Sequence, residues 1–193
     1  DPSGADAPER VVTGLPSIAP PSGAGAGGPL DIAFLGGGNA QLVMGLGATA
    51  SARAALGGKG YLLGRVLQVN AGGGWKAGAD IAAFEEANNP VPGGTDSNPY
   101  GVAALPSRHL VADAGANALF EVRTNGQVQA LAVFPARQVL APPFLGLPPG
   151  ATIPMQAVPT TVVQGPDGWL YVGQLTGFPF PVGGAHIYRV PAQ

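Results

Sequence analysis

The sequence predicts an all-β protein with the fold of a β-propeller, in which small four-stranded sheets form the blades. The first observation is a unit at residues 98–134 that contains four short apolar runs separated by turn residues. The second is that similar units recur along the chain. The third is that 32 glycines and 21 prolines accompany 46% hydrophobic residues, a combination that favours many short strands and turns over disorder.

The unit at 98–134 shows the pattern most clearly. Asn125-Gly126 lies between two apolar runs, and this pair is a strong hairpin signal because both residues tolerate positive φ. Strands are predicted at Pro99–Leu105, His109–Ala114, Ala118–Arg123 and Gln127–Phe134.

The N-terminal part of the chain predicts little regular structure. Residues 1–9 are predicted to be disordered, and the propeller is expected to occupy 10–193. Arg10–Gly14 is a β-branched run that predicts a strand without an adjacent partner. Residues 23–28 match G-x-G-x-x-G, but a proline and a strand follow where a dinucleotide site needs a helix, so we do not expect a nucleotide there.

Two further blades are predicted, near 28–84 and 158–190. In the first, an alanine-rich stretch at 48–57 predicts a short helix, and residues 84–88 predict a helical turn. Residues 135–157 contain six prolines and are expected to form an irregular insert. The strands predicted for these two blades are Pro29–Leu35, Ala40–Leu46, Tyr61–Asn70, Gly78–Ala82, Val158–Gln164, Trp169–Gln174 and Ala185–Val190.

An internal repeat connects the three blades. Pro29, Pro99 and Pro159 begin equivalent strands and lie 70 and 60 residues apart. A repeat of this length with four short strands per unit is typical of a propeller, and the first residue of a strand is a position that tolerates proline.

The amino-acid sequence of the repeat resembles those of known propeller families. LVADAGANAL at 110–119 is similar to the core of NHL repeats. More narrowly, the chain resembles the ScyD/ScyE family, which is named for scytonemin biosynthesis and whose members have further blades on both sides of this region. The segments that carry this resemblance are RVVTGLP (10–16), GPLDIAF (28–34), DSNPYG (96–101), VADAGANAL (111–119), LAVFP (131–135) and GPDGWLYVGQLTGFPFP (165–181). The resemblance implies a fold and not a particular reaction.

The predicted strand count leaves the ring open. Three blades make about half of a six-bladed ring, whereas propellers usually have four to eight blades. We therefore expect other polypeptide to complete it. One version is a homo-oligomer, in which Arg10–Gly14 supplies the outer strand of a neighbouring copy's 158–190 blade. The other version is the remaining blades of a longer chain.

Composition excludes several classes of protein. A net charge of −2 leaves no basic surface for nucleic acid. The absence of cysteine excludes disulfides, thiolate zinc sites and cysteine nucleophiles. No apolar run approaches the ~20 residues that span a bilayer. We expect an exported protein, extracellular or periplasmic, and the low charged fraction of 10% suggests a surface covered by a partner or by another copy.

The candidate metal ligands are Asp31, Asn98 and Asp113. They are the polar residues expected to point toward a propeller channel, where some propeller enzymes hold a hard cation. Calcium is the cation considered, and it takes six to eight oxygens. The alternative, which we favour, is that these side chains accept hydrogen bonds from turns and backbone.

No catalytic group is predicted. His109 and His186, the two histidines, lack metal-ligand spacing and are interpreted as surface or turn residues. Ser97 and Ser107 lack the context of a nucleophile elbow. Glu85-Glu86 is interpreted as a solvated helical face and not as a carboxylate pair.

The candidate ligand or partner loop carries Gln174, Phe178 and Phe180. Such a loop can bind another molecule, or it can pack on its own blade. The leading hypothesis is a non-enzymatic binding or scaffold module that recognises a partner or a small aromatic ligand. The rivals are a metal-dependent hydrolase or lyase of the NHL type and a self-assembling structural protein.

Overall fold

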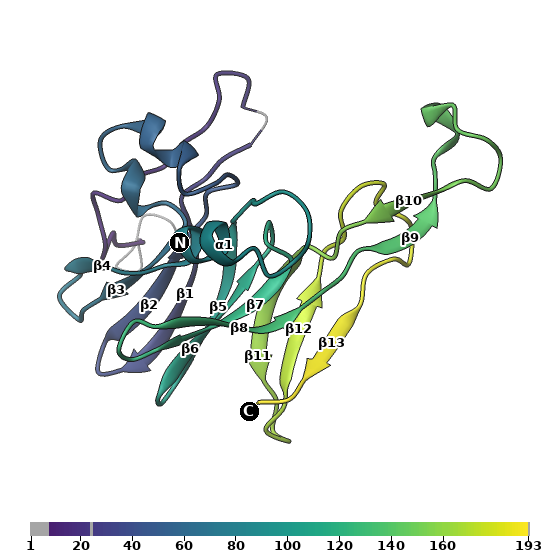
Figure 1. Cartoon of the computed structure of the whole chain (residues 1–193). Coiled ribbons are helices and arrows are strands. Elements are labelled where there is room, and N and C mark those ends of the chain that lie inside the picture. The colour runs from purple at the N-terminus through teal and green to yellow at the C-terminus, as the bar shows by residue number, and fades with distance from the viewer. Residues whose placement is uncertain (1–7, 24, 193) are drawn as a thin grey trace.

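The computed structural model describes residues 8–23 and 25–192, so most of the segment predicted to be disordered lies outside it. Within these ranges, three antiparallel sheets stand side by side, with a separate hairpin above the last (Figure 1). Strand order within each sheet follows the order of the chain. Such consecutive up-and-down sheets are propeller blades, so the prediction of an all-β propeller fold is confirmed.

The first blade contains most of the helical residues. Its strands are β1 (Pro29–Gly36), β2 (Asn39–Met44), β3 (Arg65–Val69) and β4 (Trp75–Asp80). The helix predicted at 48–57 is instead a short 3-10 helix, η1 (Ala52–Leu56), and a second one, η2 (Gly60–Leu62), follows it. The predicted turn at 84–88 belongs to a longer helix, α1 (Ile81–Asn88). No helix in the described ranges has the length and apolar character needed to cross a bilayer.

The second and third blades follow the predicted pattern. The second has four strands, β5 (Pro99–Leu105), β6 (Arg108–Asp113), β7 (Ala118–Arg123) and β8 (Val128–Val133). The third has three strands in the described part of the chain, β11 (Pro159–Gln164), β12 (Leu170–Gln174) and β13 (Ile187–Val190).

The first strands of the blades meet where the blades converge (Figure 1). The backbone N–H of Val102 in β5 donates to Asp31 Oδ2 in β1 at 2.8 Å. On the other side of β5, a Cβ at Gly101 would lie 2.6 Å from the carbonyl oxygen of Thr160 in β11. Glycine is therefore needed at 101 for β5 and β11 to approach this closely.

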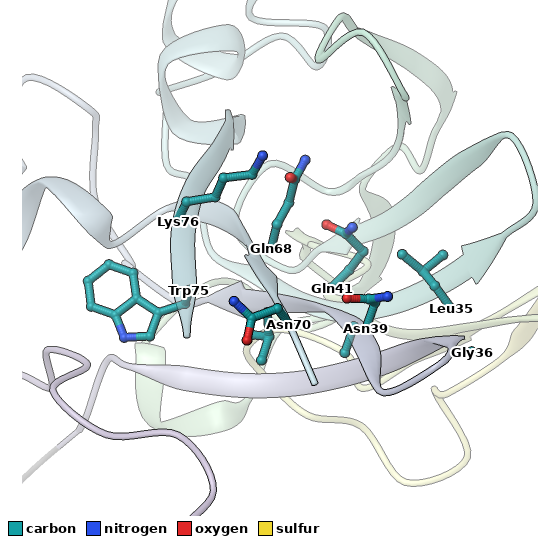
Figure 2. Close-up of a pocket in the computed structure, with 10 residues that line it drawn as sticks. Leu35, Gly36, Asn39, Gln41, Gln68, Asn70, Trp75 and Lys76 are labelled. Atoms are coloured by element: carbon teal, nitrogen blue, oxygen red, sulfur yellow. The ribbon is translucent and has the colours of Figure 1, made fainter. Parts of the chain in front are cut away.

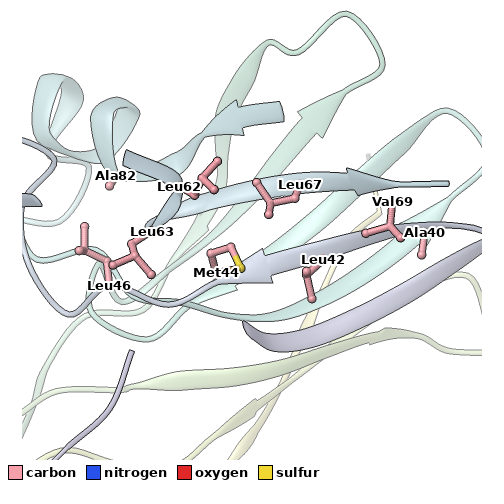
Figure 3. Packing of buried hydrophobic residues seen from close by; sticks show 9 residues of the cluster. All are labelled: Ala40, Leu42, Met44, Leu46, Leu62, Leu63, Leu67, Val69 and Ala82. Carbon is pink, nitrogen blue, oxygen red and sulfur yellow. The ribbon is translucent and has the colours of Figure 1, made fainter. Parts of the chain in front are cut away.

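Alternation of side chains divides the first sheet into two faces. Gln41 and Gln68 point to one side together with Lys76 (Figure 2), whereas Leu42 and Leu67 lie in an apolar cluster on the other side (Figure 3). Two more apolar clusters fill the spaces between the first and second blades and between the second and third. The core therefore consists of the two seams between blades and the cluster on the outer side of the first blade.

Arg10–Gly14 is not a strand, so this prediction is wrong for the single chain. The segment runs beside the first blade, where Trp75 Nε1 donates to the Thr13 carbonyl at 3.0 Å and Lys59 Nζ donates to the Gly14 carbonyl at 2.7 Å. Val12 packs against the apolar cluster of that blade. Side-chain packing on the blade, and not pairing with a strand edge, therefore positions the segment.

The insert at 135–157 is not irregular, which corrects a second prediction. It forms a hairpin of β9 (Arg137–Leu140) and β10 (Thr152–Met155), with the short turn η3 (Pro143–Leu145) near its tip. Pro154 pairs opposite Gln138 in this ribbon. A two-stranded ribbon has a free edge on each strand, so it tolerates a proline that cannot donate a backbone hydrogen bond.

Candidate functional site

Asp113, a predicted metal ligand, is a fully buried structural carboxylate. Its Oδ1 accepts the backbone N–H groups of Asn98 (2.6 Å), Gly115 (3.1 Å) and Ala116 (3.0 Å), and its Oδ2 accepts the Ser97 hydroxyl (2.7 Å). Burial raises the pKa of Asp113 to about 6, although these hydrogen bonds favour its charged form. The carboxylate holds the β6–β7 turn and the segment that enters β5.

The other predicted ligands are also engaged with backbone. Asp31 Oδ2 accepts from Val102, and Asn98 Oδ1 accepts the N–H of Leu46 at 3.1 Å. Across the described residues, no three His, Cys, Asp or Glu side chains are grouped so that they could hold a metal ion. Asn98 and Asp113 meet through a backbone hydrogen bond, but their oxygens do not fit the many-oxygen shell of calcium.

Glu85 is buried, so its interpretation as part of a solvated face is wrong. Only 2% of the residue is exposed, and its Oε2 has no hydrogen-bond partner in the described structure. Burial is the main cause that raises its pKa to about 7, and the negative charges of Asp113, Asp96 and Glu86 add to it. The residue faces inward because α1 packs Ile81 into the seam between the first two blades.

His109 is likewise buried, whereas the sequence suggested a surface or turn residue. It lies in β6 opposite Val122 and is 7% exposed, and its Nδ1 has no partner among the described residues. Burial lowers the pKa of His109, so the imidazole is neutral at pH 7. Strand alternation turns this side chain toward the first blade, which the local sequence could not show.

The aromatic rim consists of Phe144, Phe178 and Phe180. Phe144 comes from η3 in the hairpin, and the other two come from the loop between β12 and β13. The ring centroids of Phe144 and Phe178 are 6.1 Å apart and those of Phe178 and Phe180 are 6.2 Å apart, both in edge-to-face contact. Other exposed apolar residues lie on the same two segments, namely Leu140, Leu145, Leu147, Leu175 and Val182.

The loop of the rim is held by backbone hydrogen bonds. Thr176 and Phe180 have positive φ, which is unfavourable for residues with a side chain. The N–H of Thr176 donates to Ala157 at 3.2 Å, and that of Phe180 donates to Gly177 at 3.0 Å. Gln174, predicted to contact a ligand, is buried under this loop, and its amide makes no hydrogen bond to the described residues.

Arg137 connects the hairpin to the same loop, a contact that the sequence analysis missed. Its guanidinium donates to His186 Nε2 and to the Gly184 carbonyl. The sequence offered one indication that Arg137 has a special role: it is the single charged residue between Arg123 and Asp167. The rim itself carries no charge, because residues 138–166 and 168–185 contain no Asp, Glu, Lys or Arg.

Solved structures that this chain is remotely similar to include two lyases. No protein-family model matches the chain, and no curated protein sequence matches it. A catalytically inactive variant of virginiamycin B lyase from Staphylococcus aureus with quinupristin is 14% identical, with 93% of this chain and 60% of that chain covered and a TM-score of 0.35. A streptogramin B lyase is 11% identical, with 84% and 54% covered and a TM-score of 0.34. The chain thus spans less than two thirds of either structure.

Proposed function

We propose that the protein is a non-enzymatic, exported propeller module of the ScyD/ScyE type that binds an apolar or aromatic partner through the aromatic rim. The rim is the observation that carries this proposal. Phe144 is 76% exposed, and residues 138–166 and 168–185, which supply the side chains of the rim, contain no charged residue. Exposed apolar patches of this kind mark interaction sites, and loops on a rigid scaffold are where binding residues concentrate.

The arrangement suits binding because it is already ordered. Backbone hydrogen bonds hold the loop at Thr176 and Phe180, and Arg137 fixes the hairpin beside it. A partner that covers the three rings would therefore bind without first ordering them, which lowers the entropic cost of association. Burial of one such side chain contributes about 1.5–3 kcal/mol.

Binding of the fluorescent probe anilinonaphthalene sulfonate tests this proposal. Phe144→Ser and Phe180→Ser are expected to lose most of the fluorescence enhancement seen with the native protein. The matched control is Tyr61→Ser, which removes an exposed aromatic side chain (52%) from η2, outside both the rim and the apolar stripe of β1. Equal losses in the control and the rim variants would contradict a specific role of the rim. Circular dichroism would verify that each variant is folded.

We also infer that further propeller blades, from a second copy or from the rest of a longer chain, cover the outer side of β1. Leu30, Ile32 and Phe34 leave an apolar stripe exposed on this strand. Exposed strands with apolar faces favour association in water. Light scattering is the test. A mass of two copies would support the homo-oligomer, and a folded monomer of 19.1 kDa would contradict closure by a second copy.

A further inference from the structure

Two glutamines and a lysine form a row across the first blade, at the end opposite the aromatic rim. Gln41, Gln68 and Lys76 lie directly opposite one another on β2, β3 and β4, so they share one face of the sheet. Figure 2 shows all three pointing to the same side. Gln41 is only 4% exposed, and its amide makes no hydrogen bond with the described residues.

The second blade supplies the opposite wall. His109 faces this row across the seam, with its Nδ1 buried and unpartnered in the described structure. A neutral imidazole offers one donor and one acceptor. His109 Nδ1 is thus a buried atom without a partner in this seam, whereas buried polar groups in folded proteins are nearly always hydrogen-bonded. Gln41 contributes an amide that borders the same space.

A pocket lies between the residues of the first and second blades named above. A cavity of about 310 Å³ in the seam is bordered by Gln41, Gln68, Asp80 and His109. It adjoins a second hollow of about 560 Å³ near the turns of the first blade, and Gln41 and Gln68 line both. We call the two together the seam groove. Asn39, Asn70 and Lys76 also border its outer part (Figure 2).

The chemistry of the groove selects a neutral ligand. Asp80 is already in ion pairs with Arg53 and Arg65, so it does not offer a free charge to a cation. Arg123 also borders the groove, but it is ion-paired with Glu121. Among the described residues that border the groove, Lys76 is therefore the one cation without an ion pair that an anion would meet. The amides and the imidazole each combine donors and acceptors, as hydroxyl groups do.

We propose that the seam groove binds a neutral polyhydroxylated molecule the size of a monosaccharide. Its hydroxyls satisfy the amides of Gln41 and Gln68 and the ring nitrogen of His109. Its C–H faces lie against the apolar part of the wall at Leu35 and Val66. The site is independent of the aromatic rim, so either proposal can fail without the other.

Amide-resolved NMR titration with D-glucose, D-galactose, myo-inositol and D-glucuronate tests the proposal. At least one neutral probe is expected to give saturable shifts at residues 41, 68 and 109. Gln41→Leu and Gln68→Leu are expected to weaken binding about tenfold or more, because each removes hydrogen bonds to a buried group. Gln138→Leu, at an exposed position on β9, is the matched control and should bind as the native protein does.

Three results would overturn the proposal. These are no saturable shift with any neutral probe, which would indicate that the groove holds only water, a preference for D-glucuronate, and equal affinity in all variants. If Gln41→Leu does not fold, Gln68→Leu carries the test by itself, because Gln68 is only partly buried and borders both hollows. Unchanged affinity in this variant would then overturn the proposal.

Discussion

Replacement of Glu85 by glutamine should make the protein more stable at alkaline pH. The residue is 2% exposed, its Oε2 has no partner in the described structure, and burial raises the pKa of its carboxyl group from 4.5 to about 7. Since the folded-state pKa is raised, the protonated form is favoured by folding. Its contribution to stability is fully present below pH 4.5 and is lost as the pH rises through 7.

The size of the effect follows from the shift in pKa. One pKa unit corresponds to about 1.4 kcal/mol, so the shift of Glu85 corresponds to roughly 3.5 kcal/mol at most. Relaxation around the charge reduces this figure, and we expect Glu85→Gln to gain about 1–3 kcal/mol at about pH 8 and almost nothing at about pH 4.5. The raised pKa of Asp113 adds a dependence of the same sign. Because the charge of Asp113 is one cause of the raised pKa of Glu85, removal of the Glu85 charge also favours ionisation of Asp113, which acts in the direction of the expected gain.

Urea unfolding followed by tryptophan fluorescence measures this difference at several pH values. Glu9→Gln makes the same chemical change at an exposed position and should show no gain that depends on pH. A stability difference between Glu85→Gln and the native protein that stays constant across the pH range would refute the reasoning. So would a Glu85→Gln protein that is less stable than the native one at about pH 8.

Three other outcomes are expected. Asp113→Ala should lower the free energy of unfolding in urea by more than about 3 kcal/mol, because four donors lose their shared acceptor; a loss below about 1 kcal/mol would contradict this. Gly101→Ala should destabilise by about 1–3 kcal/mol, since its Cβ would meet the Thr160 carbonyl, whereas Gly94→Ala, with open space around it, should change stability by less than about 0.5 kcal/mol. EDTA should leave the Tm unchanged in scanning fluorimetry, and a fall would support a bound calcium ion.

Much of the fold could be predicted from the sequence because strands and turns depend on near neighbours. Pro99–Leu105 and Ala118–Arg123 were predicted with the bounds that the structure shows. Their apolar residues and the turn at Asn125-Gly126 constrain the backbone locally. The prolines and polar side chains of 135–157 gave no comparable signal, and only pairing of its two halves revealed the hairpin.

The candidate sites depended on contacts between distant parts of the chain. The sequence identified Phe178 and Phe180 as candidates, but it did not show that Phe144, 34 residues before Phe178, completes the rim. It also interpreted Glu85 and His109 as exposed or turn residues, and both are buried. The sequence by itself determined the blades, since alternation and turn chemistry act over a few residues. Only the tertiary structure decided which polar groups lose contact with water, because burial depends on which blades become neighbours.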